Sequence, residues 1–118
     1  MSIAAAIVVA LIGVLHVYIL VLEMFLWDKP AGLRAFGQSP EQAAASKVLA
    51  ANQGLYNGFL AAGLFWGVWL GPAGDAVKVF FLLCVLVAGL YGAATASRRI
   101  LFVQAVPAAV GLALVALS

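Results

Sequence analysis

Long apolar runs dominate this sequence and constrain its fold more than any other feature. A transmembrane helix needs about 20 consecutive apolar residues, and four windows meet that length, at 3–27, 47–70, 76–97 and 100–118. Hydrophobic residues make up 67% of the chain and charged residues only 8%, which is too little charge to cover the surface of a soluble domain. The sequence therefore predicts an all-α, polytopic membrane protein.

Polar links separate the four windows and set their arrangement. Residues 28–46 form the one sizeable loop, in which Ser39-Pro40-Glu41-Gln42 is typical of a capped helix start. The two later links are short, and Asp75 is placed to cap the third helix. Because short links make consecutive helices antiparallel neighbours, we expect a single domain over residues 1–118, folded as a four-helix up-and-down transmembrane bundle.

The basic residues predict an orientation for this bundle. Lys29, Arg34 and Lys47 lie in or beside the first loop, and Arg98 and Arg99 form the third link. The opposite side carries only one basic residue, in the third window. The positive-inside rule then places loops 28–46 and 97–99 in the cytoplasm and both termini outside. No Lys or Arg precedes the first apolar run, which is also longer than the apolar stretch of a signal peptide, so we expect it to remain as a permanent span.

Polar side chains occur inside all four windows, where they are functional candidates by default. Counted at 1.5 Å per residue, most of them lie about 6–11 Å from the cytoplasmic ends of the windows, with two nearer the midplane. We expect them to form one polar layer that opens toward the cytoplasm. The candidates for handling a substrate or proton are His16, Glu23, Asn52, Gln53, Tyr56, Asn57, Tyr91 and Gln104.

Two pairings follow from the expected depths. Gln53 should reach Glu23 or Gln104, and Asn57 should reach His16, each directly or through one water. Amides can instead be simple packing elements, since hydrogen bonds between membrane helices are worth about 1 kcal/mol or less. Glu23 is either a proton-handling acid or the partner of a cationic side chain. The candidates for that ion pair, or for holding a lipid headgroup, are Arg98 and Arg99.

Several chemistries lack the residues they need. Cys84 is the only cysteine and His16 the only histidine, so an intrachain disulfide, a cysteine metal cluster and haem held by two histidines are excluded within one chain. We therefore expect no metal and no cofactor. The six basic residues are spread over several links and form no basic stripe, so we expect no nucleic-acid partner.

Two polar-bearing segments carry a family resemblance. They run from His16 to Trp27, HVYILVLEMFLW, and from Lys47 to Leu60, KVLAANQGLYNGFL. The chain resembles, over essentially its whole length, the small bacterial membrane proteins grouped as domain of unknown function 1304. The resemblance implies a four-span, multi-pass protein of the bacterial inner membrane, with both termini in the periplasm on the orientation above. It implies no reaction and assigns no catalytic residue.

Three functional interpretations stay open. The first is a small transport or small-molecule-binding protein in the lipid bilayer, working as a homodimer or larger assembly, with Glu23 and His16 coupling protons. The second is a structural or accessory subunit whose polar layer fixes helix register. The third, and the less favoured, is a membrane-embedded enzyme acting on a lipid or quinone-like molecule, with Glu23 as acid or base and a tyrosine assisting.

Overall fold

The computed structural model describes residues 2–118, and that part of the chain contains helices but no strand. The all-α fold class is confirmed. The elements in chain order are α1 (Ile3–Met24), α2 (Pro30–Phe36), α3 (Pro40–Trp69), a 3₁₀ turn η1 (Gly71–Gly74), α4 (Asp75–Thr95), a π-helical segment η2 (Leu101–Ala105) and α5 (Val106–Ala116).

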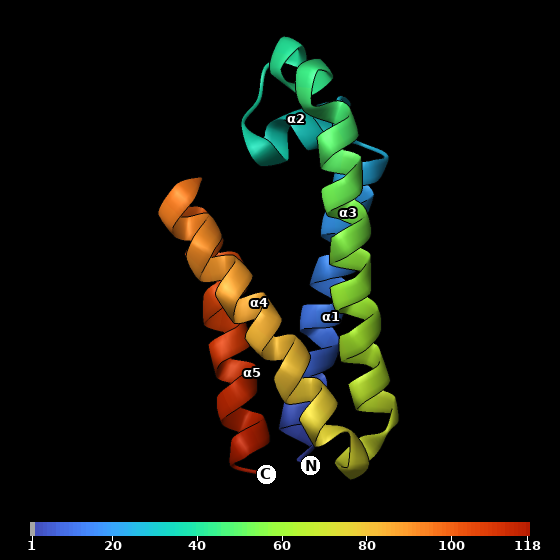
Figure 1. Cartoon of the computed structure of the whole chain (residues 1–118), viewed down its shortest axis with the longest axis vertical. Helices are drawn as coiled ribbons and strands as arrows, with labels where there is room; N and C mark the ends of the chain where they lie inside the picture. The colour runs from blue at the N-terminus through green and yellow to red at the C-terminus, as the bar shows by residue number, and fades with distance from the viewer. Residues whose placement is uncertain (1) are drawn as a thin grey trace.

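The long helices form two pairs that meet at one end and splay apart at the other (Figure 1). α1 packs along α3, and α4 packs along η2 and α5. α3 also contacts α4, and α1 contacts α5. Both termini and the α3–α4 turn lie at the end where the pairs meet, whereas α2 lies at the opposite end (Figure 1).

Two helical stretches, Ile3–Met24 and Gly71–Thr95, are long and apolar enough to cross a membrane, judged by length and composition. The helical stretch Leu101–Ala116 is apolar but shorter. α3 has 30 residues, but its run of amide side chains makes it less apolar than its neighbours. The four-span arrangement therefore stays a prediction. The first helix also ends at Met24, short of the predicted boundary at 27.

Small residues allow α1 and α3 to approach closely. A Cβ atom at Gly54 would lie 2.6 Å from Met24 Cγ and 3.1 Å from Glu23 Cβ. A Cβ atom at Gly58 would lie 2.7 Å from Leu20 Cδ1. Glycines four residues apart thus form the contact face of α3, as in the close-packing GxxxG pattern of membrane helices.

The main apolar core lies at the end where the two pairs meet. Its buried residues come from all four long helices: Ala5, Val9, Ile12, Leu64, Leu82, Val85, Ala108 and Val115. A second, smaller core occupies the opposite end, where Trp27 packs with Ala43, Ala50 and Leu33. The stretch between the two cores is therefore the part of the molecule in which polar side chains can lie between helices.

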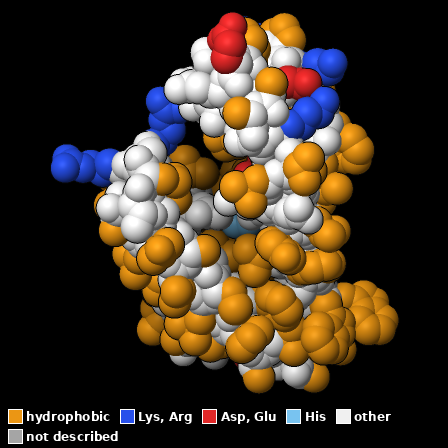
Figure 2. Space-filling view, turned by 45° about the horizontal axis from the view of Figure 1, so that its top comes forward, with side chains coloured by type: hydrophobic (Ala, Val, Ile, Leu, Met, Phe, Trp, Pro, Cys, Tyr) orange, Lys and Arg blue, Asp and Glu red, His pale blue; other side chains and the backbone are white. Residues whose placement is uncertain are grey.

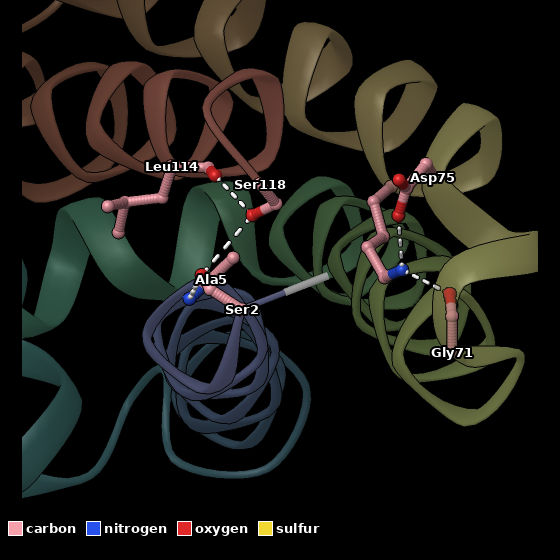
Figure 3. Close-up of polar contacts among 7 residues, drawn as sticks. Ser2, Ala5, Gly71, Asp75, Leu114 and Ser118 are labelled. Atoms are coloured by element: carbon pink, nitrogen blue, oxygen red, sulfur yellow. Dashed lines mark hydrogen bonds and ion pairs between the residues drawn. The ribbon is translucent and has the colours of Figure 1, made fainter.

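A buried lysine in the first turn of α4 is bonded to the α3–α4 turn. Lys78 is fully buried, and its Nζ donates to the Gly71 carbonyl at 2.6 Å and to Asp75 Oδ1 at 2.9 Å (Figure 3). Gly71 has φ +65°, a left-handed conformation that glycine adopts without steric cost. The prediction that Asp75 caps the third helix is wrong, because Gly74 is the N-cap and no side-chain bond caps α4. The Asp75 carboxylate accepts from Lys78 instead.

The two chain ends lie side by side next to this turn. Ser2 caps α1 by accepting from the backbone N–H of Ala5 at 3.1 Å. The Ser118 hydroxyl lies 3.2 Å from the Ser2 hydroxyl and 2.6 Å from the Leu114 carbonyl (Figure 3). The start of α1 is thereby joined to the end of α5, so the two helix pairs are held together at this end.

The polar loop at the opposite end is itself folded. Trp27 Nε1 donates to Ser46 Oγ at 3.1 Å, and the Trp27 ring lies 4.8 Å from that of Phe36 in α2. Ser39 and Gln42 form the capping box predicted for the start of α3, with both reciprocal bonds present. That helix start is therefore confirmed.

Candidate functional site

The candidate site consists of two hydrogen-bonded pairs, here called the polar cluster: Glu23 with Asn57, and His16 with Gln104. Asn57 Nδ2 donates to Glu23 Oε1 at 2.6 Å and lies 3.1 Å from the Gln53 carbonyl. Glu23 is 7% exposed, so its carboxyl group is nearly withdrawn from solvent. This pair joins α1 to α3.

The second pair joins α1 to η2. His16 is fully buried, and its Nδ1 lies 2.8 Å from the Ile12 carbonyl. Because a carbonyl only accepts, Nδ1 carries a proton. Gln104 Nε2 lies 3.2 Å from His16 Nε2, so a neutral imidazole that accepts from the Gln104 amide satisfies both contacts. The two ring nitrogens thus have different partners, one local and one on a distant helix.

The π-helical segment brings Gln104 to His16. In η2 the Val106 N–H donates to the Leu101 carbonyl, a spacing of five residues. Pro107 follows directly and has no N–H to give to the preceding turn. Gly89 of α4 allows the segment to lie close, because a Cβ there would be 2.6 Å from the Ala105 nitrogen. Short π segments of this kind occur frequently at functional sites.

The polar cluster lies beside a hollow between the two helix pairs. Figure 2 shows this hollow with the chain's only histidine on its floor and an acidic side chain on its wall. Hydrophobic side chains cover the outer surface below the hollow, and most of the visible charged side chains gather toward its upper side. Asn57 and Gln104 are partly exposed, so each pair has one partly accessible member.

Four predicted site residues do not join the cluster. Asn52, Gln53, Tyr56 and Tyr91 are all exposed, the two tyrosines at 61% and 72%. Asn52 donates only to the Val48 carbonyl, one turn away at 3.1 Å. The expected layer of converging side chains is therefore smaller than predicted and includes only one residue of the α3 polar run.

The structure shows neither of the two pairings predicted from depth as a direct contact. Asn57 binds Glu23 rather than His16, and Gln53 makes no direct side-chain bond to Glu23 or Gln104. The reason is the rotation of α3, which turns its glycine face toward α1. Gln53 precedes Gly54 and points about 100° away from it, whereas Asn57 lies nearer to that contact face.

The cationic candidates lie at the same end as α2. Arg98 and Arg99 are exposed, and neither is paired with Glu23 in the ion pairs of residues 2–118. Arg99 Nη1 instead donates to the Ala35 carbonyl at 3.3 Å. The link between α4 and η2 therefore contacts the end of α2, and the two basic links lie on one side of the molecule.

Two polar pairs outside the cluster were not anticipated. One is Lys78 with Asp75 in the first turn of α4, since from the sequence Lys78 served only as a basic residue for predicting orientation. The other is Lys47 with Asp28, whose Nζ and Oδ2 lie 2.9 Å apart. The hydrogen bond from Lys47 lowers the pKa of the Asp28 carboxyl below its ordinary value. Both pairs stabilise turns and lie outside the hollow.

The residues described provide no ligand set for a metal ion. Within 2–118, no group of three or more His, Cys, Asp or Glu side chains is placed to hold one. Proton transfer and hydrogen bonding are the chemistry that an acid, an imidazole and two amides can offer here. These groups can bind a small polar molecule and can accept or donate protons.

Comparisons with known proteins agree with the family resemblance. Residues 10–116 match the family described as "Protein of unknown function (DUF1304)". The chain is similar to "Uncharacterized protein YpaA" of Lactococcus lactis subsp. lactis (strain IL1403), with 30% identity over 119 residues that cover 99% of this chain and 96% of the relative. No solved structure matches the chain significantly. The resemblance inferred from the two polar segments is confirmed.

Proposed function

We propose, for a chain that belongs to the DUF1304 family, that it is a four-span membrane protein whose polar cluster binds a small polar solute and handles protons during its transport. The observation that carries this proposal is the hollow between the helix pairs, with an acid and an imidazole at its wall and floor (Figure 2). An ionisable side chain inside apolar helices is costly to keep there and is a functional candidate by default.

The surface of the molecule supports the membrane part of the proposal. Large hydrophobic side chains are exposed on every long helix, among them Leu11 at 61%, Trp69 at 81% and Phe80 at 61%. Exposed apolar surface of this extent has no favourable partner in water, but lipid tails provide one. We propose spans formed by α1, α3, α4 and the η2–α5 stretch in the bacterial inner membrane. α2 would then lie at the cytoplasmic boundary and both termini in the periplasm.

Two copies form the proposed working unit, since four helices make a thin wall around a polar path. A small solute would enter from the cytoplasmic end, where the hollow lies nearest to the basic links. Glu23 would exchange a proton there, and Asn57 would respond as its direct partner. The buried His16 would give the second proton-handling group, reached through Gln104.

Accessibility of the cluster to water tests this proposal. In a chain whose native cysteine is replaced (Cys84→Ala), single cysteines are placed at Asn57 and, as a matched control, at Phe59, which is 55% exposed on the outer face of the same helix. A charged, impermeant thiol reagent should label Asn57→Cys in inside-out vesicles but not in right-side-out vesicles. Phe59→Cys should stay unlabelled in both, because lipid disfavours the reactive thiolate. Equal labelling of the two positions contradicts a hollow filled with water.

Proton handling is tested separately in liposomes that contain a pH-sensitive dye. After an external acid pulse, liposomes with the native chain should acidify faster than empty ones, and Glu23→Gln should abolish the difference. Glu41→Gln provides the control, because Glu41 is an exposed acid in the first turn of α3. If liposomes with the native chain acidify no faster than empty ones, proton handling is no longer part of the proposal.

A structural or accessory role is the second candidate, and one observation favours it. Both titratable members of the polar cluster already have hydrogen-bond partners within the chain, as a cluster that only fixes helix register requires. In that case the variants of Glu23 would alter stability and leave proton entry unchanged. The enzyme interpretation is the weakest of the three, because neither Tyr56 nor Tyr91 lies at the cluster.

A further inference from the structure

A second concave region of the surface is a groove between α1 and α2. Its lining residues are Tyr18 of α1 and Ala31, Arg34 and Ala35 of α2, and its volume is about 300 Å³. Tyr18 is 57% exposed, and the Arg34 side chain is exposed as well. Neither the Arg34 guanidinium nor the Tyr18 hydroxyl has a hydrogen-bond partner in the part of the chain described. The groove therefore offers two unused donor groups.

The charges around the groove favour an anion. No acidic side chain lines it, and the nearby Asp28 is already paired with Lys47 at 2.9 Å. The Arg99 guanidinium reaches the Ala35 carbonyl at the groove wall, which adds a second cation. A guanidinium presents its donors in a planar fork that matches two oxygens of a phosphate.

An apolar stripe on α1 continues from the groove toward the opposite end of the molecule. Ile7, Leu11 and Val14 are 53%, 61% and 56% exposed. Spacings of three, four and seven residues place them on the same helical face as Tyr18. From Ile7 to Tyr18 the stripe is about 16 Å long, which is comparable to a fatty-acyl chain. Tyr18 lies where this stripe meets the polar groove, six residues before the end of α1 and about 9 Å from it along the helix axis.

We propose that this groove binds the phosphate of an anionic membrane phospholipid, with one acyl chain along the exposed stripe of α1. Arg34 and the Tyr18 hydroxyl bind the phosphate oxygens, and Arg99 adds positive charge at the wall. The inference depends on the proposed membrane insertion and on its orientation, since anionic headgroups would reach the groove from the cytoplasmic leaflet. It does not depend on proton handling by the polar cluster.

Native mass spectrometry of the full chain in detergent tests the site. Titration with phosphatidylglycerol should yield one retained lipid, whereas phosphatidylcholine should bind at least several-fold more weakly. Arg34→Gln should weaken phosphatidylglycerol binding about tenfold and Tyr18→Phe about threefold, in line with the loss of a charge-assisted and a neutral hydrogen bond. Arg34→Lys keeps the charge without the fork, so it should fall between the native chain and Arg34→Gln.

The control is Arg98→Gln, an exposed arginine at the same end that does not line the groove. This variant should bind phosphatidylglycerol like the native chain. Equal losses in Arg98→Gln and Arg34→Gln overturn the proposal, because they indicate a general charge effect. Displacement of the lipid by millimolar inorganic phosphate also overturns it, since the site would then take free phosphate. If the chain inserts into membranes but binds phosphatidylglycerol and phosphatidylcholine equally well, only the lipid site is refuted. If the chain is not found in the membrane fraction, the proposed function itself is refuted.

Discussion

Replacement of Asn57 by leucine tests whether the polar cluster is a specific contact or a by-product of packing. Asn57 Nδ2 donates to Glu23 Oε1 at 2.6 Å, and the acid is 7% exposed. Asn57→Leu removes the one side-chain partner of this carboxyl group among residues 2–118. It also places an apolar group of similar size beside a buried polar one.

The expected cost follows from two known magnitudes. A buried polar group that loses its partner is destabilised by about 1–3 kcal/mol. The proposed membrane insertion points to the lower end of that range, since interhelical bonds in membrane proteins average roughly 0.6 and reach about 1.7 kcal/mol, because the unfolded chain in the membrane also finds partners. Asn57→Leu should therefore lower the free energy of unfolding by about 1–2 kcal/mol.

The same helix provides a matched control. Gln53→Leu is also an amide-to-leucine change, one turn away, but Gln53 is exposed and its side chain makes no bond to the cluster. Its effect should stay within about 0.5 kcal/mol, as for other surface substitutions. The free energies are measured by unfolding in mixed micelles with increasing denaturing detergent, followed by far-UV circular dichroism.

A double-mutant cycle isolates the pair itself. If Asn57 and Glu23 interact directly, the effect of Asn57→Leu should shrink in a Glu23→Leu background, and the two changes should not add. Additive effects, or an Asn57→Leu variant no less stable than Gln53→Leu, would refute the contact on which the site is built. The packing of α1 on α3 would then have to be explained by the glycine face alone.

Three further predictions concern the frame around the site. The lowered pKa of Asp28 means that its pairing with Lys47 stabilises the loop at pH values above the ordinary pKa of an aspartate, and that this stabilisation is lost as pH falls through the lowered pKa. Loop stability, followed by Trp27 fluorescence, should therefore decline with acid in the native chain. Asp28→Asn should remove that pH dependence. Gly54→Leu should force α1 and α3 apart and lower the free energy of unfolding by about 2 kcal/mol or more in the detergent unfolding assay. Ala62→Leu, on the exposed face of α3, should be nearly neutral in the same assay. Ser39→Cys in the capped loop should react with an impermeant reagent only in inside-out vesicles, and its labelling in intact cells would reverse the proposed orientation.

Much of the local structure of this protein was determined by the sequence alone. Apolar windows of about 20 residues favour helices where water is scarce, because a helix satisfies each backbone group within its own segment. The start of α3 was predictable for a similar reason, since Ser39 and Gln42 satisfy the first free N–H groups of the helix without any distant contact. His16 and Glu23 were recognisable as candidates because ionisable groups are rare in such runs.

Only the tertiary structure decided which polar residues meet. Depth along a helix can be counted from the sequence, but the rotation of a helix about its own axis cannot, because it depends on which face packs best against the neighbours. In α3 that choice was made by Gly54 and Gly58, whose missing side chains allow α1 to approach. Asn57 was thereby turned toward Glu23 and Gln53 was turned outward.

The position of Gln104 had the same origin. A regular helix through residues 100–118 was expected, but the chain forms a π segment just before Pro107, and this change of pitch alters the direction of every side chain in it. The proline was a visible signal, yet its consequence depended on how closely α4 could approach at Gly89. Helices and candidate residues are local properties of this chain, whereas the pairing of those residues is a property of packing between helices distant in sequence.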